Sequence, residues 1–350
     1  MKTFYIGMKD RLLILKEENR EYTANVKLEG YKINRIAFDP KNKDRIYVGT
    51  DKGLWRSEDC GEEWKRIGTS SAGEGVSIAS DKVTSVAVHP VRRANGNSVV
   101  YAGTEPSRLY YSEDHGKTWY EFEDLQKLPS KKNWSFPPRP ETHYVRWITP
   151  SYSNTEHIAL SIEAGAILNT YDHGTTWVDR TEDSPIDAHT LLAHPKAPGR
   201  LYAANGDGTS DSRMAFTESE DEGKSWHYRS EGISEYSYLY NMAINFADPN
   251  DCLVSGSKNA SGAHRSPLYS TIYRRRDQNS WEEEADGIPK EGAYTHHLAA
   301  EPKEAGAFYA LNNFGLYYLA ASKNTWERIE IAPFENYLDQ RYYHFVVREE

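Results

Sequence analysis

Short runs of alternating apolar and polar residues, typical of β-strands with one buried face, recur along the whole chain. One kind of run ends in a turn before proline. A shorter apolar run follows it, typified by RIYVGT at 45–50, and a third run leads into a tight turn. The run before proline occurs six times: INRIAFDP (33–40), VTSVAVHP (83–90), YVRWITP (144–150), HTLLAHP (189–195), YNMAINFADP (240–249) and HHLAAEP (296–302).

An octapeptide follows the third run and recurs at intervals of 49 to 58 residues. Two decayed copies, DQNSW (277–281) and SKNTW (322–326), keep the tryptophan but lose the glycine. The four near-intact copies are SEDCGEEW (57–64), SEDHGKTW (112–119), TYDHGTTW (170–177) and SEDEGKSW (219–226).

This octapeptide specifies a hairpin turn. An Asp can accept hydrogen bonds from the backbone that follows it, and a Gly tolerates a positive φ, so together they define one tight turn. The Ser or Thr adds a local hydrogen bond, and the Trp re-enters the sheet as a large apolar group. The structural residues of the four turns are Asp59, Gly61 and Trp64; Asp114, Gly116 and Trp119; Asp172, Gly174 and Trp177; and Asp221, Gly223 and Trp226.

Each repeated unit predicts one four-stranded antiparallel blade, and the chain is expected to be all-β, a single β-propeller over residues 1–350. Residues 3–29 supply three strands and 342–348 supply a fourth, so a closing blade shared by the two termini would leave no exposed edge. This gives seven blades, with six as the alternative. The predicted blades span 33–68, 83–122, 143–180, 188–230, 239–285, 295–330, and 342–350 together with 3–30.

The octapeptides resemble the Asp-box, or BNR, repeat of sialidases, sortilin-type receptors and photosystem assembly propellers, within the wider WD40-like and YVTN-like group. The resemblance extends over essentially the whole chain. It implies the fold, but sialidase activity is not expected. The sialidase pattern needs three arginines on different blades. Here Arg146 is the only clear inner-strand arginine near the functional rim, and Arg35 is expected to face between blades.

The composition fits a ring of strands and limits the classes of function. The chain contains 25 Tyr, 10 Phe and 9 Trp, which suit half-buried strand surfaces. A formal net charge of −10 argues against nucleic acid or an anionic membrane as partner. Cys60 and Cys252 are too few for a disulfide framework, and no apolar run resembles a signal peptide or a membrane span. A cytoplasmic protein is expected.

A functional site is expected on the rim opposite the Asp boxes. This rim carries three unusually long loops, at 120–142, 204–215 and 257–269, and long loops on a rigid scaffold commonly bind ligands. Aligning the inner strands places one residue of every blade at a common register near the axis. These residues are Asn34, Thr84, Tyr144, His189, Tyr240, His296 and Tyr343.

Polar residues at this register predict a small-molecule site in the central funnel. A histidine beside a carboxylate suits acid–base chemistry near neutral pH, and Arg146 would hold a carboxylate group in a bidentate contact. The candidate catalytic residues are His189, His296, Glu163 and Tyr144. The candidate ligand-binding residues are Arg146, Tyr240, Tyr343, Asn205 and Asn312.

A divalent metal in the funnel is a further expectation, with His143, His189 and His296 as its ligands. These residues come from separate blades and share no local ligand spacing. In its architecture and its funnel histidines the chain is similar to propeller lyases of the oligogalacturonate and streptogramin B types, which hold a divalent metal. This is an analogy of fold, and the cofactor itself stays unknown.

These observations favour a hydrolase or lyase that acts on a carboxylate-bearing or sugar-like small molecule by histidine acid–base chemistry. Polar side chains that merely fill the channel around ordered water are the alternative role for the same residues. The alternative function is a non-catalytic protein-binding or assembly propeller. Trp134 and Phe136, in the 120–142 insertion, are the candidate contacts for a protein partner or the tip of a lid.

Overall fold

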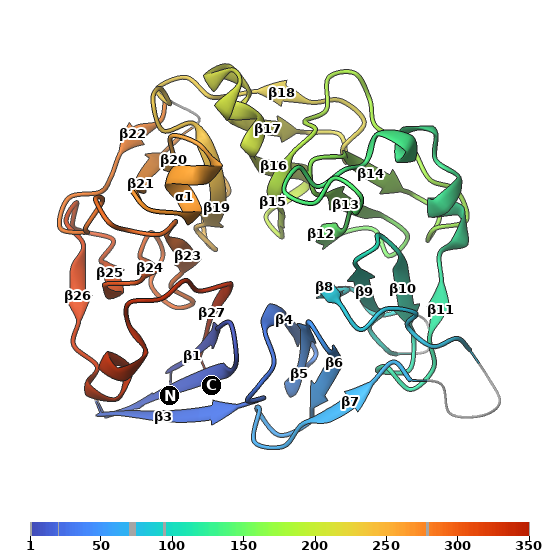
Figure 1. Ribbon diagram of the computed structural model, residues 1–350, viewed down its shortest axis with the longest axis horizontal. Coiled ribbons are helices and arrows are strands. Elements are labelled where there is room, and N and C mark those ends of the chain that lie inside the picture. Colours follow the sequence, from blue (N-terminus) through green and yellow to red (C-terminus); the bar gives the residue numbers. More distant parts are fainter. Residues whose placement is uncertain (1, 20, 70–74, 94–95, 278–279, 350) are drawn as a thin grey trace.

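A ring of seven β-sheets surrounds a central opening in the computed structural model, which describes residues 2–19, 21–69, 75–93, 96–277 and 280–349 (Figure 1). The predicted seven-bladed propeller is confirmed, and the six-bladed alternative is wrong. Some sequence predictions touch residues outside this description. These are residues 20, 94–95, 278–279 and 350 of the predicted blades, and residues 278–279 of the decayed copy at 277–281.

The first six blades follow one another along the chain, each beginning with its inner strand. Blade 1 contains β4 (Ile33–Asp39), β5 (Asn42–Thr50), β6 (Gly53–Ser57) and β7 (Lys65–Ile67). Blade 2 contains β8 (Val83–Val88), β9 (Val100–Thr104), β10 (Leu109–Ser112) and β11 (Tyr120–Glu121). Blade 3 contains β12 (Val145–Pro150), β13 (Ile158–Ile162) and β14 (Ala166–Thr170), with one further bridge between Asn169 and Val178.

The remaining sequential blades have four strands each. Blade 4 contains β15 (Ala188–His194), β16 (Ala197–Asn205), β17 (Phe216–Ser219) and β18 (His227–Tyr228). Blade 5 contains β19 (Tyr238–Ile244), β20 (Cys252–Ser257), β21 (Thr271–Arg275) and β22 (Glu282–Glu283). Blade 6 contains β23 (His297–Ala300), β24 (Phe308–Asn312), β25 (Gly315–Leu319) and β26 (Glu327–Ile329).

The two ends of the chain share blade 7, as predicted. The C-terminal strand β27 (His344–Glu349) is its inner strand and pairs antiparallel with β1 (Lys2–Gly7), from Gly7 opposite His344 to Lys2 opposite Glu349. Strands β2 (Leu12–Glu18) and β3 (Glu21–Lys27) complete the sheet. Both termini therefore lie in one blade (Figure 1), and the ladder between β27 and β1 closes the ring.

Helices are short and lie in the connections. They are η1 (Glu123–Lys127), η2 (Pro129–Asn133), η3 (Gly206–Thr209), η4 (Ser212–Met214), α1 (Ala260–His264) and η5 (Ala332–Tyr337). Within the described part of the chain, none is long and apolar enough to cross a membrane.

Neighbouring blades bury their apolar faces against each other. Tyr47 and Leu54 of blade 1, for example, belong to one buried cluster with Val86 and Tyr110 of blade 2. Because strands alternate their side chains between two faces, each blade can contribute to the cluster on either side of it. The result is a rigid ring whose inner strands hold their side chains in fixed positions around the axis.

The octapeptides form tight turns on the outer part of the blades. Asp114 Oδ1 accepts hydrogen bonds from the backbone N–H groups of Lys117 (2.9 Å) and Thr118 (2.8 Å). Gly116 has a φ of +86°, and a Cβ at this position would lie 2.6 Å from Ile67 Cδ1. The Trp119 indole is 2 % exposed and donates to Gly116 O at 3.1 Å. The hydrogen bonds are internal to the turn, and Gly116 packs it against β7 of the neighbouring blade 1.

Candidate functional site

A β-bulge interrupts the inner strand of five blades and sets the positions of the funnel side chains. In β12 the pairing passes from Val145 directly to Trp147, so Arg146 is the extra residue. The same shift isolates His189 in β15 and Tyr240 in β19. Bulges twist a strand locally and redirect side chains. The remaining bulged residues are Asn34 in β4 and Thr84 in β8.

This pairing corrects the register expected for blade 3. Arg146, rather than Tyr144, occupies the position equivalent to His189 and Tyr240. Three consecutive blades therefore contribute an arginine, a histidine and a tyrosine at one level. The Arg146 guanidinium carbon lies 4.9 Å from the centre of the Tyr240 ring, and the rings of His189 and Tyr240 are 5.3 Å apart.

Two adjoining cavities lie at this level. The axial cavity, about 430 Å³, is lined by residues from all seven inner strands. The side cavity, about 460 Å³, lies between blades 3, 4 and 5 and includes residues of α1. The residues common to both cavities are Phe136, Tyr144, Arg146, Tyr240 and Arg341. These shared side chains form the partition between the two spaces.

The axial cavity is rich in cations although the protein carries net negative charge. Lys32, Arg35 and Arg341 line it, and none of them forms an ion pair with a carboxylate in the described part of the chain. They contact aromatic rings instead. Lys32 Nζ is 4.4 Å from the Tyr343 ring centre, and Arg35 lies 3.6 Å from that of Trp147. Burial lowers the pKa of Lys32, as expected for a cation removed from water.

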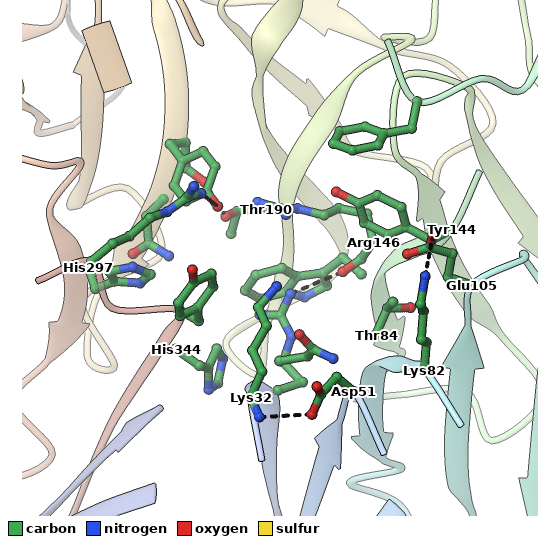
Figure 2. Close-up of a pocket in the computed structure, with 18 of the residues that line it drawn as sticks. Lys32, Asp51, Lys82, Thr84, Glu105, Tyr144, Arg146, Thr190, His297 and His344 are labelled. Carbon is green, nitrogen blue, oxygen red and sulfur yellow. Dashed lines mark hydrogen bonds and ion pairs between the residues drawn. The ribbon is translucent and has the colours of Figure 1, made fainter. Parts of the chain in front are cut away.

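The other charged groups around the axial cavity already have an ion-pair or hydrogen-bond partner at the wall. Arg139 donates to both oxygens of Glu105, and Lys82 lies 3.2 Å from the same carboxylate. Asp51 accepts a hydrogen bond from the backbone N–H of Lys32 at 2.8 Å. Figure 2 shows the contacts of Lys82 with Glu105 and of Lys32 with Asp51 at the wall, while the Lys32 and Arg146 side chains extend into the space between the blades. The unpaired positive charge therefore lies near the axis.

A cluster of two carboxylates and one histidine lines the side cavity. Glu163 follows β13, Asp187 precedes β15, and His189 lies in β15. His189 Nε2 is 3.3 Å from Asp187 Oδ2 and 3.9 Å from Glu163 Oε1. Burial would lower the pKa of His189, but the two carboxylates outweigh it and raise the pKa to about 9. We call Glu163, Asp187 and His189 the carboxylate–histidine cluster.

Tyr240 stands between two arginines. Arg341 Nη2 donates to the Tyr240 hydroxyl at 3.1 Å, and the Arg146 guanidinium faces the ring. Burial alone would raise the pKa of this phenol. The charges of Arg146 and Arg341 outweigh burial and lower the pKa to about 7. Tyr144 differs, because burial and the Glu163 carboxylate hold its pKa well above its usual value.

Four of the predicted site residues lie outside both cavities. His296 is buried between Ser270 O, 3.2 Å from its Nε2, and the side-chain amide of Asn312. Asn205 donates to Met214 O and Thr217 Oγ1. His143 Nδ1 accepts from the backbone N–H of Ser107 at 3.3 Å. The residues that the structure does bring to the cavities are Tyr144, Arg146, Glu163, His189, Tyr240 and Tyr343.

The three predicted metal ligands therefore do not meet at one point. Among them only His189 belongs to a group of metal-ligating side chains in the described residues, and its neighbours there are Glu163 and Asp187. Trp134 is also placed differently from the expectation. It is 4 % exposed, and its indole donates to Ser130 Oγ, so it is not available to a partner. Phe136 lines both cavities.

Sequence reasoning missed four important residues. Arg35 faces the axial cavity and donates to Arg146 O at 3.0 Å, whereas the sequence placed it between blades. Lys32 and Arg341 lie in loops just before the inner strands β4 and β27. Asp187 lies two residues before His189, and this Asp-x-His spacing was the one available signal. Charge just before an inner strand is the general feature that would have identified Lys32, Asp187 and Arg341, whereas Arg35 lies within β4.

Comparisons with known proteins agree with the fold. No protein-family model matches the chain. A xyloglucanase of Hypocrea jecorina (strain QM6a) is 29 % identical over 130 residues, which are 36 % of this chain and 14 % of that enzyme. The GH74 enzyme of Niastella koreensis superimposes with a TM-score of 0.66 at 13 % identity, over 92 % of this chain and 51 % of that one.

A second kind of propeller is also similar. The structure of YCF48 bound to D1 peptide superimposes with a TM-score of 0.54 at 15 % identity, over 88 % of this chain and 84 % of that one. The resemblance to Asp-box propellers is thus confirmed at the level of fold. The chain spans about half the length of the GH74 enzyme, and its match to the xyloglucanase covers about one seventh of that enzyme.

Proposed function

We propose that the axial cavity binds a small carboxylate-bearing, sugar-like ligand and that the chain acts on it as a lyase. The observation that carries this proposal is the group formed by Lys32, Arg35 and Arg341, which lacks carboxylate partners in the described residues. Cations held together in a partly buried space repel one another, and a bound anion relieves this repulsion. Arg146 lines the same cavity, but its charge is partly neutralised by an ion pair with Glu163, in which Nε and Oε2 are 3.3 Å apart.

The shape and the aromatic lining support a sugar-like ligand. A volume of about 430 Å³ lies in the range of small-molecule sites. Tyr144, Tyr240 and Tyr343 line this space, and each combines an apolar ring with a polar tip, which suits a molecule with apolar faces and many hydroxyl groups. The similarity to xyloglucanase and GH74 propellers is consistent with a carbohydrate ligand, although it extends to the fold alone.

Elimination suits this geometry better than hydrolysis. Both carboxylates of the side cavity hold one oxygen toward His189, and neither lines the axial cavity where the ligand carboxylate would bind, so neither is placed to attack a sugar carbon there. In elimination, a base removes the proton from the carbon next to the ligand carboxylate, and the C–H electron pair forms the new double bond. The oxygen substituent on the following carbon leaves with the electrons of the broken C–O bond and takes a proton from water. Arg341 and Lys32 would stabilise the negative charge that develops on the carboxylate. Tyr240, held by Arg341, is the group placed to take the proton.

The alternative is a protein-binding propeller without chemistry. Its observation is the fold shared with YCF48 bound to D1 peptide. Of the two aromatic residues expected to contact a protein partner, Trp134 is buried and Phe136 faces the cavities. The funnel therefore supports a small ligand better than a protein, and the partner itself is unidentified.

The Arg341→Met variant tests the anion site. Affinity for oligouronides, measured by isothermal titration calorimetry, should fall by about 10- to 100-fold, because a charged hydrogen bond contributes roughly 1.5–3 kcal/mol. Thermal stability should change little, because Arg341 has no carboxylate partner to leave unpaired and the relief of repulsion from Lys32 and Arg146 offsets the lost hydrogen bond to the Tyr240 hydroxyl. Arg348→Met is the matched control. It removes the same charge from an arginine that packs on Phe38 outside the cavities.

The ligand panel includes the corresponding neutral oligosaccharides. The proposal predicts that the wild-type protein binds the uronides and not the neutral sugars. It also predicts that cleavage yields a product with a new carbon–carbon double bond, whose formation is measured by ultraviolet absorbance. Equal affinity of wild type and Arg341→Met for every uronide, or binding of neutral sugars alone, would overturn the anion site. Cleavage that produces new reducing ends without the double bond would show that the reaction is hydrolysis and not elimination.

A further inference from the structure

We propose that Glu163, Asp187 and His189 bind a divalent transition-metal ion, at a site separate from the anion position in the axial cavity. One ligand atom from each residue can be chosen so that all three lie within 4.8 Å of one another. At metal–ligand distances of about 2.1 Å, neighbouring ligand atoms are about 3.0–3.4 Å apart. The 3.3 Å between His189 Nε2 and Asp187 Oδ2 already fits.

The hydrogen bond on the far side of the imidazole fixes the ring for this role. His189 Nδ1 lies 2.6 Å from Leu239 O. A carbonyl oxygen only accepts hydrogen bonds, so Nδ1 carries the hydrogen and Nε2 is the atom that faces the two carboxylates. Metal-binding histidines are commonly held in this way by a backbone carbonyl. In the described structure Nε2 lies 3.3 Å from Asp187 Oδ2 and 3.4 Å from the Tyr238 hydroxyl, and a metal bound to Nε2 would take the place of its proton and of these contacts.

Glu163 gives an independent indication of a missing partner. The residue is 7 % exposed, and its Oε2 has no hydrogen-bond partner in the described structure. Arg146 Nε lies 3.3 Å from this oxygen but donates its hydrogen to His189 O at 3.1 Å. A buried carboxylate oxygen that accepts no hydrogen bond is costly, and a metal ion bound by both oxygens of Glu163, Oε1 on the His189 side and Oε2, would satisfy it. Glu163 Oε1 is 3.9 Å from His189 Nε2, so a small movement of the Glu163 side chain toward His189 would bring all three ligand atoms to the spacing expected around a metal ion.

The surroundings leave room for an ion and its remaining ligands. All three residues line the side cavity of about 460 Å³, so water or a ligand group could occupy the open coordination positions. Carboxylate and imidazole together suit Mn²⁺ or Zn²⁺ better than Ca²⁺, which prefers oxygen ligands only. Because Arg146 offsets one of the two negative charges, we expect micromolar rather than nanomolar affinity.

The test uses the metal alone, so that its failure is separate from failure of the proposed lyase. Chelator-treated protein is titrated with MnCl₂ and with ZnCl₂ by isothermal titration calorimetry. We expect one equivalent of Mn²⁺ or Zn²⁺ to bind with micromolar affinity and to raise the melting temperature. Asp187→Asn and Glu163→Gln should each weaken this binding at least tenfold.

Asp51→Asn is the control, since it neutralises a carboxylate of the axial cavity that lies outside the cluster. It should bind the metal like wild type. If Glu163→Gln does not fold, Asp187→Asn still decides, because Asp187 is only half-buried and asparagine can still accept from Ala164 N. Absence of binding by both ions in wild type, or equal binding by Asp187→Asn and Asp51→Asn, would overturn the site and leave the cluster as an ion pair.

Discussion

Replacing Tyr240 by phenylalanine should lower the kcat for cleavage of an oligouronide by about 10²- to 10⁴-fold, the usual contribution of a positioned proton-transfer group. KM should change only a few-fold, because Lys32, Arg35 and Arg341 remain to hold the ligand carboxylate. The phenyl ring keeps the same volume, so the packing against Arg146 and His189 is retained. Steady-state kinetics on the double-bond product measures both constants.

The control for this substitution is Tyr120→Phe, which removes a hydroxyl from an exposed residue of β11 and should leave both constants unchanged. Whether the substitution changes kcat or KM distinguishes a role of Tyr240 in proton transfer from a role in ligand binding. A loss confined to KM would mean that the Tyr240 hydroxyl only binds the ligand. Wild-type kcat in Tyr240→Phe would exclude Tyr240 as the proton-transfer group.

Deletion of residues 342–350 should open the ring. It removes β27, the inner strand of blade 7, and exposes the edge of β1 along its whole length. Phe345, 6 % exposed, packs with Phe4 in the cluster that joins blades 6 and 7, and this contact is lost as well. We expect a loss comparable to the whole free energy of unfolding of a typical domain, about 5–15 kcal/mol, and aggregation through the free edge.

Complementation separates ring closure from a general effect of truncation. A synthetic peptide with the sequence of residues 341–350 should add as a strand to β1 and restore the thermal transition of the truncated chain. A peptide of the same composition in scrambled order should not restore it. A truncated chain that melts like wild type without any peptide would contradict closure by the shared blade.

The fold was predictable because its signals are local and repeated. In SEDHGKTW and its relatives, the Asp, Gly and Trp each serve the same turn in blades 1 to 4, so one sequence contains several copies of the evidence. The shared blade was predictable for a related reason. Strands left over at the two ends matched complementary parts of the same unit, and β27 indeed pairs with β1.

The site was predictable only in part, because it depends on relations between blades. The β-bulge that makes Arg146 equivalent to His189 and Tyr240 is defined by the pairing of two strands. The sequence of the inner strand alone gives no signal of it. Arg341 and Lys32 lie outside the repeated strands, so an alignment of repeats passes over them. His296 has the expected residue type at the expected register, yet it bonds to Ser270 and Asn312 instead of facing the funnel.

The most direct test of the anion site is a crystal structure of the protein soaked in selenate, with the selenium located by its anomalous scattering. Selenate is an oxyanion that requires no knowledge of the natural ligand. We predict an anomalous peak in the axial cavity, within hydrogen-bonding distance of Arg341 and Lys32, and its disappearance in Arg341→Met. Selenate found only at surface cations, with none in the axial cavity at the same concentration, would contradict an anion site at the centre of the ring.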